Sequence, residues 1–203
     1  MQTEIPDTIQ SKTQDNSQKV ILSLYDYSGE WSRPYREAGY IVRQIDIKNG
    51  DDVRRFPYPG KVHGILAAPP CTAFAGSGAL YWKEKDNDGR TFEGLALVDA
   101  VLRFVVVCSP KWWVIENPVG RLKYWLGPPK LIFQPYWYGD PYTKRTCLWG
   151  SFNALLPRTD VQPVRVCEQG SWIQRLGGKS ERTKELRSIT PAGFSKAFFL
   201  ANP

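Results

Sequence analysis

The chain has little of the chemistry on which metal centres and disulfide frameworks depend. It contains a single histidine, His63, and its four cysteines never stand in CxxC spacing. We therefore expect no bound metal and no disulfide, with the thiols reduced. No apolar run approaches the roughly 18 residues of a membrane span, and the N-terminus lacks the basic and apolar regions of a signal peptide. These absences predict a cytoplasmic protein without a membrane partner.

Acidic residues are fewer than basic residues in this chain. The chain has 20 Asp and Glu against 27 Lys and Arg, which gives a net charge of +7 and an isoelectric point near 9.2. A positive excess of this kind favours a polyanionic partner such as nucleic acid, through attraction to phosphates. The same excess could serve solubility alone, so the charge by itself leaves both interpretations open.

The pattern of apolar residues predicts one domain after a polar tail. Residues 1–18 hold too little apolar surface to order themselves, so we expect a flexible tail before a single domain over 19–203. Apolar runs then alternate with segments of helical spacing, which favours a doubly wound, mostly parallel α/β sheet. The predicted strands are 20–25, 40–47, 63–68 and 112–116, with two more around 140–142, and the predicted helices are 32–38 and 91–108.

The most informative segment ends the third predicted strand. The apolar run 64–68 is followed by Pro69, Pro70 and Cys71. Because the prolines forbid continuation of the strand, Cys71 should lie on the loop at the carboxyl edge of the sheet, where open α/β sheets bind ligands. A thiol held there suits a nucleophile, although most free cysteines are small buried hydrophobes.

A second segment has the same design. The apolar run 112–115 is followed by Glu116, Asn117 and Pro118. The sequence therefore predicts a carboxyl group and an amide at the end of another strand, at the same edge of the sheet as Cys71. Taken alone, a capped turn with a solvated carboxylate explains these residues equally well.

A turn with one glycine follows the first predicted strand. Within residues 25–31, Gly29 stands between a strand and a helix. Backbone N–H groups could approach a nucleotide-like ligand there, or the glycine could only supply a special backbone conformation. Asp46 ends the next strand roughly 20 residues on, the position from which an acidic side chain bonds a ribose hydroxyl in Rossmann-like folds. Asp52 follows on the next loop.

In their residues and in their order, these segments resemble the DNA cytosine-5 methyltransferases, specifically the short versions often carried by phages. Pro70 and Cys71 match the family's Pro-Cys loop, and Glu116 with Asn117 matches its Glu-Asn motif. The resemblance covers nearly everything after the tail. It implies the Rossmann-like fold of the class I S-adenosylmethionine-dependent methyltransferases and a protein of the bacterial or phage-infected host cytoplasm.

The resemblance also implies a basic residue in the site and a cofactor. The segment 138–146 looks like a later family motif in which a basic residue assists at the target base, and Arg145 is the best match. The implied cofactor is S-adenosyl-L-methionine, and Asn202 looks like part of the family's last motif, which helps to line the cofactor pocket. The residues predicted to bind the cofactor are Tyr25, Tyr27, Ser28, Gly29, Trp31, Asp46, Asp52, Pro70 and Asn202.

The region that holds a separate target-recognition domain in larger relatives shrinks here to about residues 152–186. That is too short for a domain, so we expect low sequence specificity, and we expect a monomer. Basic and aromatic residues interleave in this region, as in a surface that contacts phosphates and stacks bases, or in a solvated loop with one anchoring tryptophan. The candidate DNA contacts are Arg165, Trp172, Arg175, Lys179 and Arg182.

The resemblance implies methyl transfer to carbon 5 of cytosine in DNA through a covalent adduct of Cys71, with the cytosine flipped into the pocket. Glu116 would protonate or hydrogen-bond N3 of the ring, and Asn117 would orient it. Two alternatives stay open. One is an enzyme that modifies a free nucleotide such as dCMP or uses another one-carbon donor, and the other is an inactive DNA-binding decoy or accessory protein.

Overall fold

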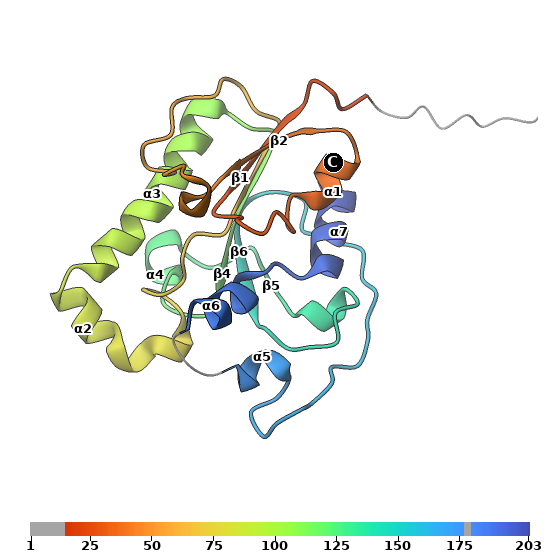
Figure 1. The fold of residues 1–203 in the computed structure, drawn as a ribbon. Coiled ribbons are helices and arrows are strands. Elements are labelled where there is room, and N and C mark those ends of the chain that lie inside the picture. The colour runs from red at the N-terminus through yellow and green to blue at the C-terminus, as the bar shows by residue number, and fades with distance from the viewer. Residues whose placement is uncertain (1–14, 177–179) are drawn as a thin grey trace, which may run out of the picture.

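The computed structural model describes residues 15–176 and 180–203. Within them the chain forms a mixed α/β fold in which one sheet carries helices on both faces (Figure 1). The strands are β1 (Val20–Leu24), β2 (Ile41–Ile45), β3 (Gly64–Ala67), β4 (Trp112–Pro118), β5 (Leu131–Phe133) and β6 (Thr146–Ser151). The α-helices are α1 (Arg33–Glu37), α2 (Trp82–Asn87), α3 (Arg90–Cys108), α4 (Lys123–Leu126), α5 (Trp172–Arg175), α6 (Glu181–Ser188) and α7 (Ala192–Ala201), and the 3-10 helices are η1 (Ile47–Asn49), η2 (Gly76–Tyr81) and η3 (Pro135–Trp137).

The strand order of the sheet is β2-β1-β3-β4-β6-β5. β1 pairs in parallel with β2 and β3, and β3 pairs in parallel with β4. β6 is antiparallel to both of its neighbours, β4 and β5. The predicted mostly parallel α/β sheet is confirmed, with β6 as its reversed strand. The chain order changes direction between β1 and β3, and open sheets bind ligands outside the carboxyl ends of strands at such a point.

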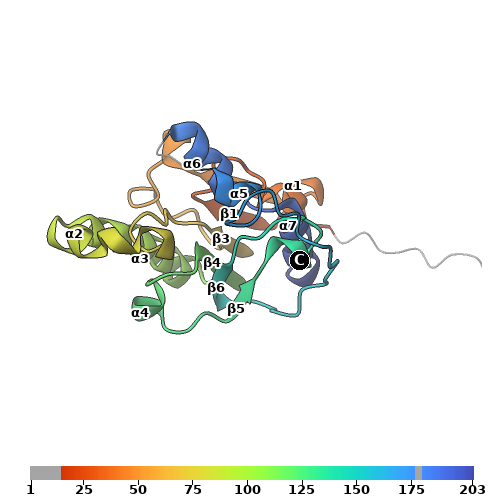
Figure 2. The ribbon, with the colours of Figure 1, turned by 90° about the horizontal axis from the view of Figure 1, so that it is seen from below.

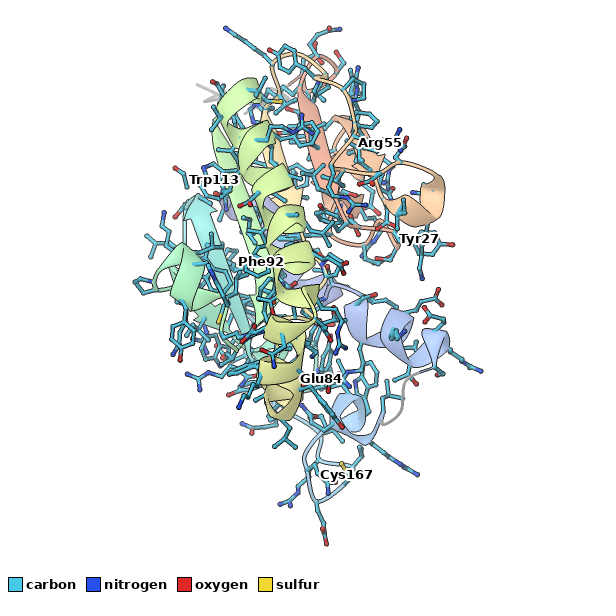
Figure 3. All side chains as sticks on the ribbon, turned by 90° about the vertical axis from the view of Figure 1, so that its left-hand side faces the viewer. Tyr27, Arg55, Glu84, Phe92, Trp113 and Cys167 are labelled. Carbon is cyan, nitrogen blue, oxygen red and sulfur yellow. The ribbon has the colours of Figure 1, made fainter. Side chains whose placement is uncertain are left out.

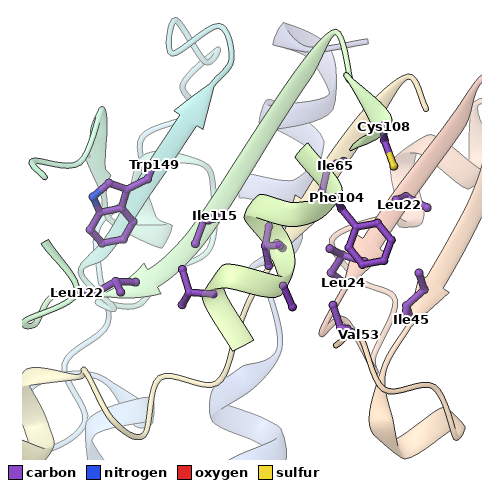
Figure 4. Close-up of a cluster of buried hydrophobic side chains, with 14 of the residues drawn as sticks. Leu22, Leu24, Ile45, Val53, Ile65, Phe104, Cys108, Ile115, Leu122 and Trp149 are labelled. Carbon is purple, nitrogen blue, oxygen red and sulfur yellow. The ribbon is translucent and has the colours of Figure 1, made fainter. Parts of the chain in front are cut away.

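Helix α3 covers one face of the sheet because its apolar residues recur at helical spacing. Val98, Val101 and Phe104 are at most 1% exposed. They pack against apolar side chains of β1, β3 and β4 (Figure 4). Burial of a side chain of this size stabilises a fold by roughly 1.5–3 kcal/mol. The helix spans 90–108, within one residue of its predicted bounds.

Helices α1 and α7 cover the opposite face. Phe194 and Phe198 of α7 are fully buried, and the ring centroid of Trp31 lies 6.0 Å from each of theirs. Tyr35 of α1 is equally buried, and its hydroxyl donates to Asn202 O at 2.8 Å. The last helix therefore packs on residues from the beginning of the chain.

Several elements differ from those that the sequence predicts. Of the two strands expected around 140–142, only the later one forms, as β6. The residues just before Asp140 belong to the 3-10 helix η3, which Pro135 starts, and the strand β5 lies earlier. β4 continues through Pro118, which was expected to end it, since pairing with β6 extends as far as Thr146. Helix α6 was not predicted. It begins after Ser180, whose side chain accepts a hydrogen bond from Thr183 N.

Residues 1–14 of the predicted tail lie outside the described residues. The last residues of that tail, 15–18, form a turn before β1. Asn16 Nδ2 donates to Ala38 O at 2.9 Å, and Lys19 N donates to Asn16 O. This part of the predicted tail is therefore bound to the end of α1.

The two edges of the sheet carry different parts of the chain. The carboxyl ends of the parallel strands point downward in Figure 1, where α5 and α6 lie, and Figure 2 views this edge from below. The C-terminus lies at the other edge, where His63 Nε2 is 2.9 Å from Pro203 O. In the part of the chain that the structure describes, no helix is long and apolar enough to cross a membrane.

Candidate active site

Cys71 lies on the loop that follows β3, at the carboxyl edge of the sheet. Ala68 N donates to the last carbonyl of β1 at 3.0 Å, after which two prolines turn the chain out of the sheet. Phe74 N and Ala75 N both donate to Cys71 O at 2.9 Å. These two bonds fix the turn that carries the thiol, and Cys71 is half-buried there.

Glu116 and Asn117 lie near the end of β4 and point to opposite faces of the sheet, because side chains alternate along a strand. Asn117 is fully buried. Its Nδ2 atom donates to Pro69 O at 2.9 Å. This bond joins the end of β4 to the loop of Cys71, so the two segments singled out in the sequence are neighbours in the fold.

The carboxyl group of Glu116 is shielded from solvent. Its side chain is 14% exposed, and Oε1 lies 4.0 Å from Lys144 Nζ. Burial raises the pKa of Glu116 above the ordinary carboxyl value, and the positive charge of Lys144 opposes this rise in part. A carboxyl group with a raised pKa keeps its proton closer to neutral pH and can then donate a hydrogen bond.

Cys71 belongs to the same electrostatic group. Burial raises the pKa of its thiol, and the negative charge of Glu116 raises the pKa further. The positive charges of Lys144 and Arg187 lower it. A thiolate at Cys71 therefore becomes easier to form when Glu116 is protonated, since the two groups titrate together.

Lys144 is the basic residue that faces Glu116, and Arg145, which the resemblance predicts to assist at the target base, is the residue next to it. Arg145 is exposed, and its charge acts on Cys147, which lies on the α3 side of the sheet. Lys144 N donates to Gln134 Oε1 at 2.9 Å, which fixes the backbone there. Of the two cations, Lys144 is the one that pairs with the carboxyl group.

The turn after β1 is built around a buried carboxylate that the sequence analysis did not single out. Asp26 is 4% exposed, and its Oδ2 atom accepts from Ser23 Oγ at 2.8 Å and from Ser32 Oγ at 2.9 Å. Ser28 Oγ donates to Oδ1 at 3.3 Å. In the sequence, the only sign of this network is that serines stand before and after Asp26, at positions 23, 28 and 32. This network fixes the shape of the turn in which the predicted cofactor residues stand.

Tyr25 and Gly29 both take left-handed backbone conformations in this turn, with φ of 60° and 70°. The hydroxyl of Tyr25 donates to a backbone carbonyl of α3 at 2.9 Å. A Cβ on Gly29 would stand 3.1 Å from the Gln44 side chain. Tyr27 and Ser28 are exposed and remain open to a ligand.

Asp46 and Asp52 follow β2 beside this turn. Asp46 is 8% exposed, and its Oδ1 atom accepts from Lys48 N at 2.9 Å, whereas Oδ2 has no hydrogen-bond partner among the described residues. Asp52 instead forms an ion pair with Arg54 at 2.7 Å. It lines a cavity of about 340 Å³ together with Gly50, Asp51, Arg55, Phe56 and Pro57.

Pro70 borders a second cavity, of about 190 Å³, between the loop of Cys71 and the first turns of α3. Pro70 itself is exposed, so its ring is available to a bound molecule. The cavity is lined by Pro70, Thr72, Ala73, Lys85, Arg90, Glu93, Gly94 and Leu97. It mixes apolar surface with charged groups at its rim.

Two of the residues predicted to bind the cofactor do not lie open at the carboxyl edge of the sheet. Trp31 is completely buried in the apolar cluster beneath α7. Asn202 lies at the opposite edge of the sheet, where its Oδ1 atom accepts from Asn153 N at 2.7 Å and its Nδ2 atom donates to Asn153 O at 3.1 Å. The Asn202 side chain therefore joins two chain segments far from Cys71.

Helix α6 lies across the carboxyl edge. Lys48 Nζ forms an ion pair with Glu185 Oε1 at 2.6 Å and lies 4.9 Å from the centre of the Tyr27 ring. In Figure 3 Tyr27 is seen above α6, and the loop with Cys167 projects below α5. Glu185 of α6 thus lies near the turn after β1, and Arg187, two residues later in the same helix, lowers the pKa of the Cys71 thiol through its charge.

The candidate DNA contacts are surface residues of α5, α6 and the loop before them. Trp172 is 39% exposed, and its ring centroid lies 5.2 Å from that of Tyr142. Arg165 is exposed and donates to backbone carbonyls of its own loop. Arg175 and Arg182 are exposed, and Lys179 lies outside the described residues. No group of three His, Cys, Asp or Glu side chains within 15–176 and 180–203 is placed to hold a metal ion.

No family model matches the chain, and no curated protein matches it in sequence. A solved structure from E. coli, described as a presumed DNA modification methyltransferase encoded within a prophage, is similar to it with a TM-score of 0.45 and 17% sequence identity. The match covers 73% of this chain and 52% of that chain, so this chain spans about half of that protein's length. A likeness as distant as this one says nothing about function.

Proposed function

We propose that this protein transfers a methyl group from S-adenosylmethionine to carbon 5 of cytosine in DNA. The bond from Asn117 to Pro69 carries this proposal, because it joins the loop of Cys71 to the strand of Glu116. A thiol, a shielded carboxyl group and a cation then share one edge of the sheet. These are the groups that covalent activation of a pyrimidine ring requires.

Cys71 acts as the nucleophile in this proposal. Carbon 5 of cytosine is a poor nucleophile, so the ring must be activated first. The Cys71 thiolate forms a bond to C6, and the electron pair of the C5=C6 bond moves through C4 to N3. The methyl donor would give its methyl group to C5 and leave as a neutral thioether. A base then takes the C5 proton, the electron pair of that C–H bond re-forms the C5=C6 bond, the electron pair of the S–C6 bond returns to Cys71, and N3 returns its proton to Glu116. The thiolate is thereby regenerated.

Glu116 supplies the proton that N3 takes up. Its raised pKa supports this role, because a carboxyl group must be protonated to donate to the ring. The proton on Glu116 also removes the negative charge that opposes a thiolate at Cys71. Lys144 and Arg187 then stabilise the thiolate. Protonation of Glu116 therefore makes this residue a proton donor to N3 and also favours the thiolate of Cys71.

The turn after β1 and the end of β2 fit a nucleoside-containing cofactor. Asp46 keeps one carboxylate oxygen free in a nearly buried position, which suits hydroxyls of a ribose. Tyr27 and Ser28 would line the same pocket, within a Rossmann-like fold of the class I methyltransferase kind. S-adenosylmethionine, when bound, supplies an electrophilic methyl group on its sulfonium sulfur.

DNA is the proposed substrate because of the charge around this edge. The chain has a net charge of +7, and exposed Arg175 and Arg182 lie on the short helices next to the site. Exposed Trp172 offers a ring on which a base can stack. In the described part of residues 152–186 the helices are short, α5 and the first residues of α6, so we propose low sequence specificity.

The test is methyl transfer by purified protein from methyl-labelled S-adenosylmethionine. Duplex DNA, single-stranded DNA and dCMP are offered separately, and the products are digested to nucleosides. Cys71→Ser is the loss variant, and Cys167→Ser, on the loop that projects from the molecule, is its matched control. We expect label in 5-methylcytosine from DNA with the wild type and the control, and none with Cys71→Ser.

Other outcomes would redirect the proposal. Label from dCMP alone would move the function to the nucleotide pool. DNA binding without label from any substrate would contradict the enzyme and favour a binding protein. Equal label with Cys71→Ser would remove the covalent mechanism.

A further inference from the structure

The loop that carries Cys71 is bound to the segment that follows β4. Backbone hydrogen bonds of 2.9 Å run from Gly76 N to Val119 O and from Arg121 N to Phe74 O. These bonds lie on the far side of the loop from the prolines. The loop is therefore attached at one end to β4, through Asn117, and at its other end to the segment that follows β4.

The side chain of Arg121 adds a third attachment. It is 5% exposed, and its Nε atom donates to Ala73 O at 3.0 Å. One terminal nitrogen donates to both carboxylate oxygens of Asp86, at 2.8 and 2.9 Å, and the other donates to Thr91 Oγ1 at 2.7 Å. The guanidinium thus binds the cysteine loop, α2 and α3 at once.

Aromatic rings shield this guanidinium. Its central carbon lies 5.1 Å from the ring centre of Trp82 and 5.7 Å from that of Trp125. Asp86, in contrast, has a side chain that is 50% exposed, and it belongs to α2, which has no buried residue. The guanidinium of Arg121 is therefore buried and fixed in place, whereas its ion-pair partner Asp86 lies on the surface of the molecule.

We propose that Arg121 is a positioning residue and that its pairing with Asp86 holds the loop of Cys71 beside Glu116. This inference rests on the proposed function for its effect on catalysis, but its effect on the Cys71 thiol is independent of any substrate. Loss of the attachment frees the loop at Ala73. The thiol then moves toward solvent and away from the carboxyl group that raises its pKa.

The test compares Arg121→Lys, which keeps the charge but loses the forked geometry, with Asp86→Asn, a change on the surface side of the pair. Arg33→Lys, at an ion pair on α1, is the matched control. The first measurement is the rate of Cys71 alkylation by iodoacetamide as a function of pH, followed by peptide mass spectrometry. The second is kcat and KM for methyl transfer.

We expect both variants to alkylate Cys71 about fivefold faster than the wild type at pH 8, with the thiol titrating at lower pH. We expect kcat to fall by about 10²-fold while KM for S-adenosylmethionine stays within about twofold, since misplacement of a reacting group by 1 Å costs this much. Arg33→Lys should match the wild type in both measurements.

Wild-type alkylation in both variants would overturn the proposal, whether or not kcat falls. A variant that loses only thermal stability, with alkylation and kcat unchanged, would show that Arg121 is structural alone. If the wild type alkylates as expected but transfers no methyl group, the proposed function fails while faster alkylation in Asp86→Asn still supports the positioning role.

Discussion

Glu116 Oε1 lies 4.0 Å from Lys144 Nζ, and both side chains are shielded, at 14% and 15% exposure. At this separation the two charges attract each other without forming a short hydrogen bond. Burial raises the pKa of Glu116 above its ordinary value, and the charge of Lys144 offsets only part of this rise. The carboxyl group can therefore keep its proton closer to neutral pH, beside Cys71.

Replacement of Glu116 by glutamine should separate the two functions of this residue. The variant lacks the negative charge that raises the pKa of Cys71. Alkylation of Cys71 by iodoacetamide at pH 8 should therefore be about threefold to tenfold faster, whereas methyl transfer should fall by about 10²-fold or more. Peptide mass spectrometry gives the first rate and label incorporation the second. Slower alkylation in the variant would contradict the coupling between the two groups.

Lys144→Met should have the opposite effect on the thiol. Lys144 lowers the pKa of Cys71, so without it alkylation at pH 8 should be about threefold slower or more. Arg145→Met is the matched control, because that side chain is exposed and acts on Cys147 instead. The rate of Cys71 alkylation at pH 8 is measured for both variants, Lys144→Met and Arg145→Met. An effect in Arg145→Met and none in Lys144→Met would reverse the assignment.

Asn117→Ala should destabilise the fold. The substitution removes the buried bond to Pro69 O and leaves that carbonyl without its donor, which costs about 1–3 kcal/mol in the free energy of unfolding. Urea denaturation at pH 7 measures this change. Asn49→Ala, at an exposed position in η1, serves as the control and should change the free energy by less than about 0.5 kcal/mol. Equal effects of the two substitutions would argue against a special bond at Asn117.

The stability of the protein should depend on pH through Glu116. Burial raises the folded-state pKa of this carboxyl group above its unfolded value. Its contribution is then fully present below the unfolded pKa and is lost as pH rises through the folded pKa. Glu116→Gln avoids that loss, so it should be more stable than the wild type by about 0.5–2 kcal/mol at pH 8. The difference should shrink toward pH 4, as measured by urea denaturation at both pH values. A difference that grows toward pH 4 would contradict the raised pKa.

The sequence alone located the edge of the sheet at which Cys71 and Glu116 lie. Each follows an apolar run that is too short for a helix. Prolines come between the first run and Cys71, and Pro118 comes two residues after Glu116. Parallel strands bring their carboxyl ends to one edge, so two strand ends were sufficient to predict that the loop and the carboxyl group are neighbours. The bond through Asn117 then follows from the close approach of these ends.

The rest of the site depended on features that one sequence does not contain. The choice between Lys144 and Arg145 is set by the side of the sheet to which each points, and this depends on the position at which β6 begins. Asn202 matches a family motif in its residue type, but α7 runs to the opposite edge of the sheet before that residue is reached. The ring of Trp31 is completely buried, because a large ring that follows a turn can fill the core.

The pairing of β4 with β6 sets Glu116 opposite Leu148 and Asn117 opposite Cys147. Because successive side chains alternate, a slip of one residue would exchange the places of the acid and the amide. The composition of both strands would hardly change, yet the carboxyl group would face α3. Insertion or deletion of a single codon in either strand should therefore be tolerated less well than exchange of one apolar residue there for another.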